Sequence, residues 1–307
     1  MRRVQTCLLA ATLTAISGGC GGHVITDHQK VTPSVAMEAT REELLDAYNQ
    51  MARATKTLNA TVELKPTAGS KYSGVIDEYH EVKAFLLAAR PAEIRVIGQA
   101  PVIGKTVFDM ACDGETFRVS IPSKKKFLVG AVSTEKVSSK PIENLRPQHL
   151  LDALLWPEIR KEEAVTLREF NDEKGRYYVL TVLRGGYQVE VLREIWFDRA
   201  DLRVSRMETF GPKGALLSDV SLGDWQAIDR AAISAGGTQA TGTPPTGGVT
   251  SFPRAIRVNR PHDDYTLDLQ VTKITVNEDI PAERFQLEQP AGTELVRVGE
   301  AVENKPQ

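Results

Sequence analysis

The residues best suited to acid–base or metal chemistry are scattered along this sequence of 307 residues. His262-Asp263-Asp264 has side chains that could hold a metal ion, but it stands between Pro261 and Tyr265 in a pattern typical of a hairpin turn. Asp77, Glu78, His80 and Glu81 lie in a strand-like segment whose alternation sends neighbours to opposite faces, so they make no ready carboxylate pair. The G-x-S-x-G, H-E-x-x-H, P-loop and G-x-G-x-x-G patterns do not occur. We expect no enzyme, no catalytic residue, no metal and no cofactor.

The cysteines offer a different chemistry. Arg2 and Arg3 precede an apolar run from Leu8 that ends in small residues just before Cys20, which is the order of a secretory signal segment. The run is too short to be a membrane-spanning helix. Cys112 lies in an apolar stretch and is expected to be a buried, inert thiol. Cys7 would leave with the signal, so no disulfide framework remains.

Ile16-Ser17-Gly18-Gly19-Cys20 resembles the lipobox of bacterial lipoproteins, although Ser17 replaces the usual leucine. The resemblance implies that residues 1–19 are a lipoprotein signal peptide and that Cys20 is lipidated, which would anchor the chain in a membrane. The alternative is a plain secreted protein in which this cysteine occurs by chance. Gly21 is not the aspartate associated with inner-membrane retention, so we expect the outer membrane, with the protein facing the periplasm. Residues 20–39 lack periodicity and predict a flexible tether.

Charge argues against nucleic acid as a partner. The chain has 38 Lys and Arg against 40 Asp and Glu, and removing residues 1–19 takes away two arginines and no acid. The mature chain is therefore slightly acidic, which disfavours a general nucleic-acid role. Its 41% apolar content is sufficient for a sizeable core.

The elements begin with a helix. Thr40 and Glu43 have capping-box spacing, and an apolar stripe from Leu44 to Leu58 predicts about five turns, with Asn49 on the opposite, polar face. This stripe could bind a membrane or a partner, but packing on the chain's own sheet is favoured.

From residue 59 the period changes to two, and most joints carry turn residues. A second helix is expected between Pro141 and Pro157, with Pro147 at its first position. Lys124, Lys125 and Lys126 form a basic turn that either is simply solvated or touches anionic headgroups. Strands are expected over 61–65 (with a turn over 66–70), 72–89 (as one bent strand or two), 92–99, 106–112, 115–121, 127–129, 165–170, 177–183, 189–197, 203–210, 216–225, 255–259 and 265–276.

Residues 229–251 are rich in Gly, Thr, Ala and Pro, which predicts a disordered insertion within a hairpin, the alternative being a domain linker. We expect one domain over residues 40–295, followed by a polar tail over 296–307. Its pattern predicts an α+β fold, mainly antiparallel β, in which helices cover the concave face of a strongly curved sheet.

Three stretches make the pattern similar to the LolA/LolB-like superfamily, the periplasmic lipoprotein carrier and its outer-membrane receptor. They are Ala89-Arg90-Pro91-Ala92-Glu93-Ile94-Arg95, then Pro101-Val102-Ile103-Gly104 with Asp113-Gly114 after it, and Ile280-Pro281-Ala282-Glu283-Arg284-Phe285. The resemblance spans most of residues 40–295 but is diffuse. This chain is longer than either member, and its insertion at 229–251 has no counterpart in them.

The resemblance implies a half-open curved β-barrel whose apolar cavity binds the acyl chains of lipoproteins. A loop at Val102 and Ile103 would face the membrane. The chain would be a monomeric, anchored lipoprotein that binds lipid or lipoprotein acyl chains in lipoprotein sorting or outer-membrane biogenesis. The alternative is an assembly lipoprotein with a filled interior that binds an envelope protein. The expected cavity residues, each of which could equally be ordinary core, are Leu86, Ile94, Val96, Phe108, Phe117, Leu150, Leu151, Leu154, Val182 and Trp196.

Overall fold

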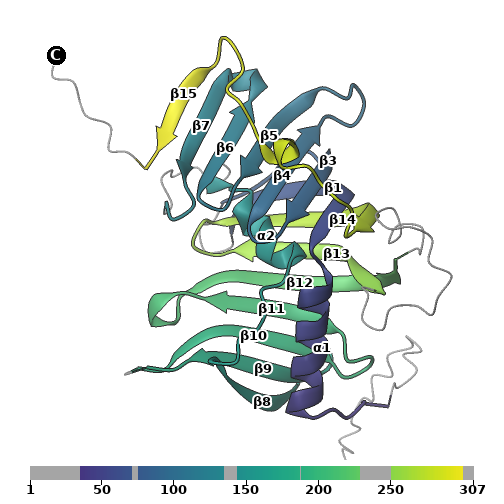
Figure 1. The fold of residues 1–307 in the computed structure, drawn as a ribbon. Coiled ribbons are helices and arrows are strands. Elements are labelled where there is room, and N and C mark those ends of the chain that lie inside the picture. Colours follow the sequence, from purple (N-terminus) through teal and green to yellow (C-terminus); the bar gives the residue numbers. More distant parts are fainter. Residues whose placement is uncertain (1–34, 71–74, 135–143, 187, 229–249, 300–307) are drawn as a thin grey trace, which may run out of the picture. The chain divides into compact units, whose positions relative to one another are not determined.

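The computed structural model describes residues 35–70, 75–134, 144–186, 188–228 and 250–299 (Figure 1). The chain divides into two units, Met1–Val35 and Ala36–Gln307, and the fold below is that of the second. The expected signal peptide, Cys20, most of the tether and almost all of the 229–251 insertion lie outside the described residues. No described helix combines the length and apolar character needed to cross a membrane.

The second unit is built mainly from strands. Its helices are α1 (Arg41–Ala54) and α2 (Gln148–Leu154), with short 3-10 turns η1 (Pro122–Lys124), η3 (Pro212–Gly214) and η4 (Ala282–Phe285). The strands are β1 (Thr57–Ser70), β2 (Val75–Glu78), β3 (Val82–Ala89), β4 (Glu93–Gln99), β5 (Thr106–Cys112), β6 (Thr116–Ile121), β7 (Lys126–Ala131), β8 (Ala164–Asn171), β9 (Arg176–Arg184), β10 (Glu190–Asp198), β11 (Val204–Phe210), β12 (Leu216–Ala227), β13 (Ser251–Arg260), β14 (Tyr265–Val276) and β15 (Glu294–Val298).

All of these strands join one 15-stranded sheet in the order β15-β7-β6-β5-β4-β3-β1-β14-β13-β12-β11-β10-β9-β8, with β2 beside β1. Every strand pair among the described residues is antiparallel except β15 with β7. Among the described strands, β15 and β8 are the two ends of this order, so the sheet is open. The predicted α+β class, mainly antiparallel and half-open, is confirmed.

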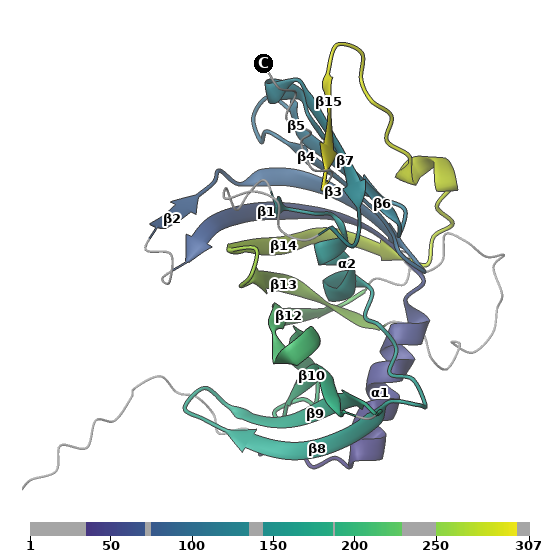
Figure 2. The same ribbon diagram turned by 90° about the vertical axis from the view of Figure 1, so that its left-hand side faces the viewer.

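The sheet curves around α2. This helix contacts both β4 and β13, which are four places apart in the strand order. In a flat sheet those strands would be separated by about 19 Å, whereas a helix is only about 10 Å across. Both strands can reach α2 only if the sheet bends toward it (Figures 1 and 2). We call the face that carries α2 and the main hydrophobic core the inner face, and the opposite face the outer face.

Helix α1 begins where the sequence predicts. Thr40 caps it, and the Thr40 and Glu43 side chains satisfy each other's backbone amides in a capping box. The helix has 14 residues rather than five turns, because Leu58 already belongs to β1. Asn49 is buried rather than on the solvated face, because its side chain hydrogen-bonds the backbone of Ile159.

The expected turn over 66–70 is wrong, because β1 continues through it to Ser70. Pro66 has no backbone N–H to donate to a neighbouring strand. On one side it lies opposite Leu267 of β14, and on the other side it lies at the gap where the pairing of β1 changes from β3 to β2. Its carbonyl accepts from Tyr79, which turns the chain between those two strands. The segment expected over 72–89 as one strand or two is therefore two, β2 and β3.

Two further elements differ from expectation. Helix α2 has only seven residues, and Pro147 is its N-cap rather than its first residue. Strand β15 runs to Val298, past the expected domain end at residue 295, and pairs with β7. The strands flanking the 229–251 segment, β12 and β13, are direct partners in the sheet.

Candidate functional site: the apolar inner face and its helix

The inner face holds most of the side chains that the sequence predicts as cavity wall. Leu86, Ile94, Val96, Phe117 and Val182 are all fully buried in one hydrophobic cluster, together with the three leucines predicted on α2. They come from β3, β4, β6 and β9, which lie on both sides of the centre of the sheet. The structure therefore brings these residues together on one face.

Phe108 is half-buried against the same cluster. It lies opposite Gly98, and a Cβ atom at Gly98 would come within 2.4 Å of the Phe108 ring. Phe117 makes a matching contact, since a Cβ at Gly130 would lie 2.7 Å from its ring. In both places the glycine's missing side chain gives an aromatic ring room on the inner face.

Trp196 is the exception among the predicted wall residues. Its neighbours on β10, Ile195 and Phe197, are fully buried in the core, so alternation directs Trp196 to the outer face. There its indole donates to Glu208 at 3.1 Å and packs edge-on against Phe170. The assignment of Trp196 to a cavity wall is wrong, because an aromatic residue in a strand can cover either face and the sequence pattern around it does not decide which.

Helix α2 packs on the inner face, as does α1 through Leu44, Tyr48 and Ala52. Leu150, Leu151, Leu154 and the capping Leu155 are between 1% and 8% exposed and belong to the main core cluster. Met110, Leu267 and Leu269, which the sequence analysis did not single out, lie in the same cluster. The inner face is therefore an apolar surface packed against a short helix.

A polar group fixes the start of α2. The His149 ring hydrogen-bonds the Tyr265 hydroxyl, and its other nitrogen lies 3.5 Å from an Arg260 nitrogen. Arg146, just before the helix, stacks its guanidinium 4.4 Å from the Phe117 ring centre. Burial, followed by the positive charges of Arg260 and Arg146, lowers the pKa of His149 to about 2. His149 is consequently neutral at physiological pH, and burial also raises the pKa of the Tyr265 hydroxyl.

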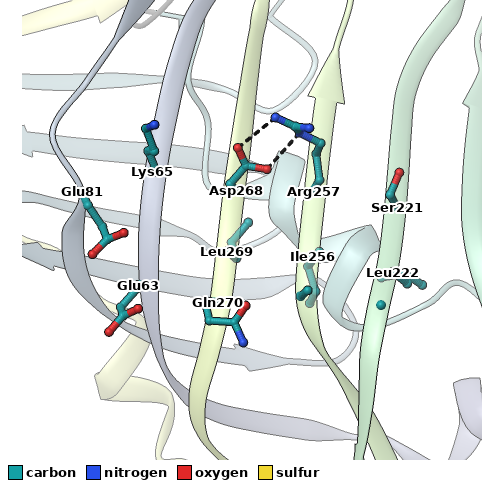
Figure 3. A pocket seen from close by; sticks show the side chains of 12 residues that line it. Glu63, Lys65, Glu81, Ser221, Leu222, Ile256, Arg257, Asp268, Leu269 and Gln270 are labelled. Atoms are coloured by element: carbon teal, nitrogen blue, oxygen red, sulfur yellow. Dashed lines mark hydrogen bonds and ion pairs between the residues drawn. The ribbon is translucent and has the colours of Figure 1, made fainter. Parts of the chain in front are cut away.

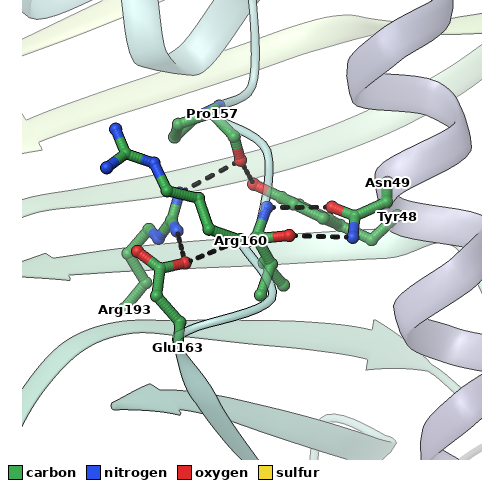
Figure 4. Close-up of polar contacts among 7 residues, drawn as sticks. Tyr48, Asn49, Pro157, Arg160, Glu163 and Arg193 are labelled. Carbon is green, nitrogen blue, oxygen red and sulfur yellow. Dashed lines mark hydrogen bonds and ion pairs between the residues drawn. The ribbon is translucent and has the colours of Figure 1, made fainter. Parts of the chain in front are cut away.

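A second polar group fixes the chain after α2 (Figure 4). Asn49 of α1 donates to the carbonyl of Ile159 at 3.1 Å and accepts from its amide at 2.9 Å, which explains why this asparagine is buried. The Pro157 carbonyl accepts from Tyr48 at 2.9 Å and from Arg193 at 3.0 Å. These contacts satisfy the polar backbone of a segment that has no regular structure.

Arg90 adds a further anchor at this point. Its guanidinium donates to three carbonyls, those of Ala52, Thr55 and Trp156, at 2.7 to 2.9 Å. The Trp156 ring stacks on Tyr48 with 5.5 Å between ring centres. The segment that follows α2 is thus held to α1 by both polar and aromatic contacts.

Two hollows lie on the outer face rather than beside α2. One, of about 500 Å³, is lined by polar side chains that include Glu63, Lys65 and Asp268 and by apolar residues that include Leu222, Ile256 and Leu269 (Figure 3). Its Arg257 and Asp268 form an ion pair at 2.9 Å. The other, of about 370 Å³, is lined by polar residues of β1, β13 and β14 together with Ile274. The charged and hydroxyl groups of this second hollow suit water better than an alkyl chain.

The predicted membrane-facing loop is exposed. Val102 is 94% and Ile103 is 73% exposed at the tip of the connection between β4 and β5. Two backbone hydrogen bonds close the loop, from Ala100 to the Lys105 carbonyl and from Gly104 to the Ala100 carbonyl. Gly104 has a φ of +63°, which a residue with a side chain rarely adopts. The loop therefore holds two large apolar side chains in water, which is unusual for a protein surface.

No family model matches the sequence, and no curated protein is similar to it in sequence. Solved structures do match the fold. A LolA superfamily protein from Nitrosomonas europaea is 14% identical, covers 81% of this chain and 99% of its own, and has a TM-score of 0.46. A DUF1329 family protein from Desulfovibrio piger is 12% identical over 79% of this chain and 94% of its own, with a TM-score of 0.48.

The acidic and histidine residues considered for catalysis or metal binding do not form a cluster. Across the described ranges, no group of three or more His, Cys, Asp and Glu side chains is placed to hold a metal ion. Asp263 instead pairs with Arg260 at 2.8 Å, and Glu78 pairs with Lys65 at 2.7 Å. Cys112 is 1% exposed, and burial raises the pKa of its thiol, as expected for an inert core cysteine.

Proposed function

We propose that this protein is a lipid-anchored envelope lipoprotein that binds lipid or lipoprotein acyl chains on its inner face. It would serve lipoprotein sorting or outer-membrane biogenesis, with Cys20 as the anchor. The observation that carries the proposal is the pairing of a large apolar inner face with a seven-residue helix as its cover.

The exchange of this cover for an acyl chain is energetically balanced. The side chains of Leu150, Leu151, Leu154 and Leu155 together contain about as much hydrocarbon as one long acyl chain. Burying four leucines contributes about 6–12 kcal/mol, and burying an acyl chain contributes about 0.8 kcal/mol per methylene. An acyl chain could therefore replace α2 at little net cost in buried apolar surface, provided that the contacts of His149 are broken.

The exposed loop supports the same function. Val102 and Ile103 can enter the hydrocarbon edge of a bilayer, where their apolar surface leaves water. A domain tethered near that bilayer could then accept a chain from it without diffusing as a shuttle does.

Native mass spectrometry after gentle purification tests the ligand. We expect the protein to carry masses of lipid, or to take up an added fatty acyl probe at a stoichiometry of one or a few chains. If the protein is lipid-free and also fails to take up acyl probes, the proposal is wrong.

Metabolic labelling with a radioactive fatty acid tests the anchor. The native chain should incorporate label, and the Cys20→Ala chain should not. Equal labelling of the two would refute lipidation at Cys20.

A second function fits the packing of the interior. Because the α2 leucines already fill the inner face, the protein could be an assembly lipoprotein that binds an envelope protein and no lipid. Affinity purification from envelopes would then recover a stoichiometric protein partner, and native mass spectra would remain free of lipid.

A further inference from the structure

We propose that the end of the sheet carrying the Val102–Ile103 loop is a docking surface for anionic phospholipid bilayers, with a rim of lysines that selects negative charge. This inference rests on the proposed function, because it names the surface with which the domain meets its membrane. We call it the basic rim, and it consists of Lys83, Lys105, Lys124, Lys125 and Lys126.

Strand register places the loop and the rim at the same end of the sheet. Gln99 pairs with Thr106 just before the β4–β5 loop, and Lys83 pairs with Gln99 from the neighbouring strand. Ser120 pairs with Asp109, so β6 runs toward the same end and turns there into β7. The two hairpin tips are two strands apart, which is about 10 Å. The apolar loop and the lysine turn are therefore adjacent.

All five lysines of the basic rim are exposed. The turn that carries three of them is fixed: Pro122 starts η1, and Lys125 adopts the left-handed conformation with its amide bonded to the Pro122 carbonyl. At about 0.1 M salt the Debye length is about 10 Å, so charges this close act together on a nearby surface.

The acidic side chains described around Lys83, Lys105, Lys125 and Lys126 do not outnumber these lysines. Glu81 is exposed beside Lys83, and Glu294 begins β15 in register with Lys126. Asp109 is already held by a two-pronged contact from Arg95, at 2.8 and 3.1 Å. Among the described residues the excess at this end is positive, whereas the chain as a whole has a net charge of −2. A local positive patch on an acidic protein is complementary to anionic headgroups.

Apolar side chains extend the contact below the loop. Phe85 and Val107 are each 38% exposed on the outer face near this end, and the Lys83 ammonium lies 5.4 Å from the Phe85 ring centre. The apolar loop, the partly exposed Phe85 and Val107 and the basic rim together form an arrangement suited to a membrane interface. The loop would enter the headgroup region while the lysines remain among the phosphates.

The test uses the full chain with Cys7→Ala and Cys20→Ala, so that neither lipid nor a second accessible thiol interferes, and with Ile103→Cys carrying an environment-sensitive dye. Cys112 stays, because it is buried. Vesicles of phosphatidylcholine alone, and of phosphatidylcholine with one third phosphatidylglycerol, are titrated in. We expect a blue shift of the dye with the anionic vesicles and little with the neutral ones. Raising the salt to about 1 M, where the Debye length is about 3 Å, should abolish the difference.

Charge variants test the rim itself. Lys124→Gln, Lys125→Gln and Lys126→Gln together should raise the lipid concentration at half-maximal shift at least tenfold, because each basic residue near an anionic surface contributes a severalfold factor. The matched control, Lys161→Gln with Lys174→Gln and Lys213→Gln, removes the same charge from exposed sites elsewhere and should stay within about twofold.

Three outcomes would overturn the inference: no dye shift with either vesicle, equal shifts with both, or equal losses in the two triple variants. The acyl-probe uptake described above is measured without vesicles. Failure of the docking surface alone would therefore leave uptake unchanged, whereas failure of the proposed function would abolish uptake whatever the dye reports.

Discussion

Replacing Asn49 by alanine should destabilise the protein strongly, although asparagine on a helix is usually a solvated residue. Asn49 satisfies both the amide and the carbonyl of Ile159, a residue that is only 4% exposed. Removing the side chain leaves two buried backbone groups without that partner, at about 1–3 kcal/mol each. Alanine returns about 0.5 kcal/mol of helix propensity. We therefore expect the free energy of unfolding to fall by about 1.5–5.5 kcal/mol.

Urea unfolding followed by circular dichroism measures this change, provided that the slopes of the two transitions agree. Gln50→Ala is the matched control, since Gln50 is exposed on the same turn, and it should change stability by less than about 0.5 kcal/mol. Tyr48→Phe should cost only about 1 kcal/mol, because Arg193 still donates to the Pro157 carbonyl. If Asn49→Ala were as stable as Gln50→Ala, the reasoning that the Asn49 contacts hold the segment after α2 would be wrong.

The remaining predictions concern pH, packing and the buried thiol. In the folded protein the pKa of His149 is about 2, whereas in the unfolded chain it would be about 6.5. Between these two pH values only the unfolded chain binds the proton, so the stability of the folded protein rises with pH. Its contribution should be about 2 kcal/mol smaller at pH 5 than at pH 7, and urea unfolding of His149→Gln at the two pH values should lack that difference; equal pH dependence of the two proteins would contradict it. Gly130→Ala should destabilise by about 1–3 kcal/mol because its Cβ would strike the Phe117 ring, while Gly223→Ala, with open space around it, should be nearly neutral by the same assay. In the mature chain, Cys112 should react with a thiol reagent only after denaturation, and rapid reaction of the folded protein would show that the core at β5 is open.

Local signals in the sequence were sufficient for most of the fold. The capping box at Thr40, the Asp113-Gly114 turn and the alternation of Ile94 and Val96 each act within a few residues, and the structure has all three. The strand through Pro66 could not be predicted in this way, because what permits a proline there is the gap between β3 and β2 on the neighbouring side. Strand β15 was missed for a similar reason, since its partner β7 lies far away in sequence.

The candidate site shows the same division. Strand alternation and the leucine cluster of α2 were enough to select inner-face residues, because apolar side chains in such patterns are directed to a core. The contacts that hold α2 could not be predicted from the sequence, because His149 reaches Tyr265 and Arg260, which are cross-strand partners in β14 and β13, only where the sheet curves around α2. Trp196 was misplaced because its large ring covers the outer face, where Arg206 lies 5.3 Å from the ring centre.

Photo-crosslinking with a fatty acid that carries a diazirine on its chain, followed by peptide mapping, tests acyl-chain binding most directly. We expect labels on inner-face residues such as Leu86, Ile94 and Val96 and on α2, and we expect unlabelled fatty acid to compete for this labelling. Saturable labelling confined to the outer face, or no competed labelling at all, would contradict it.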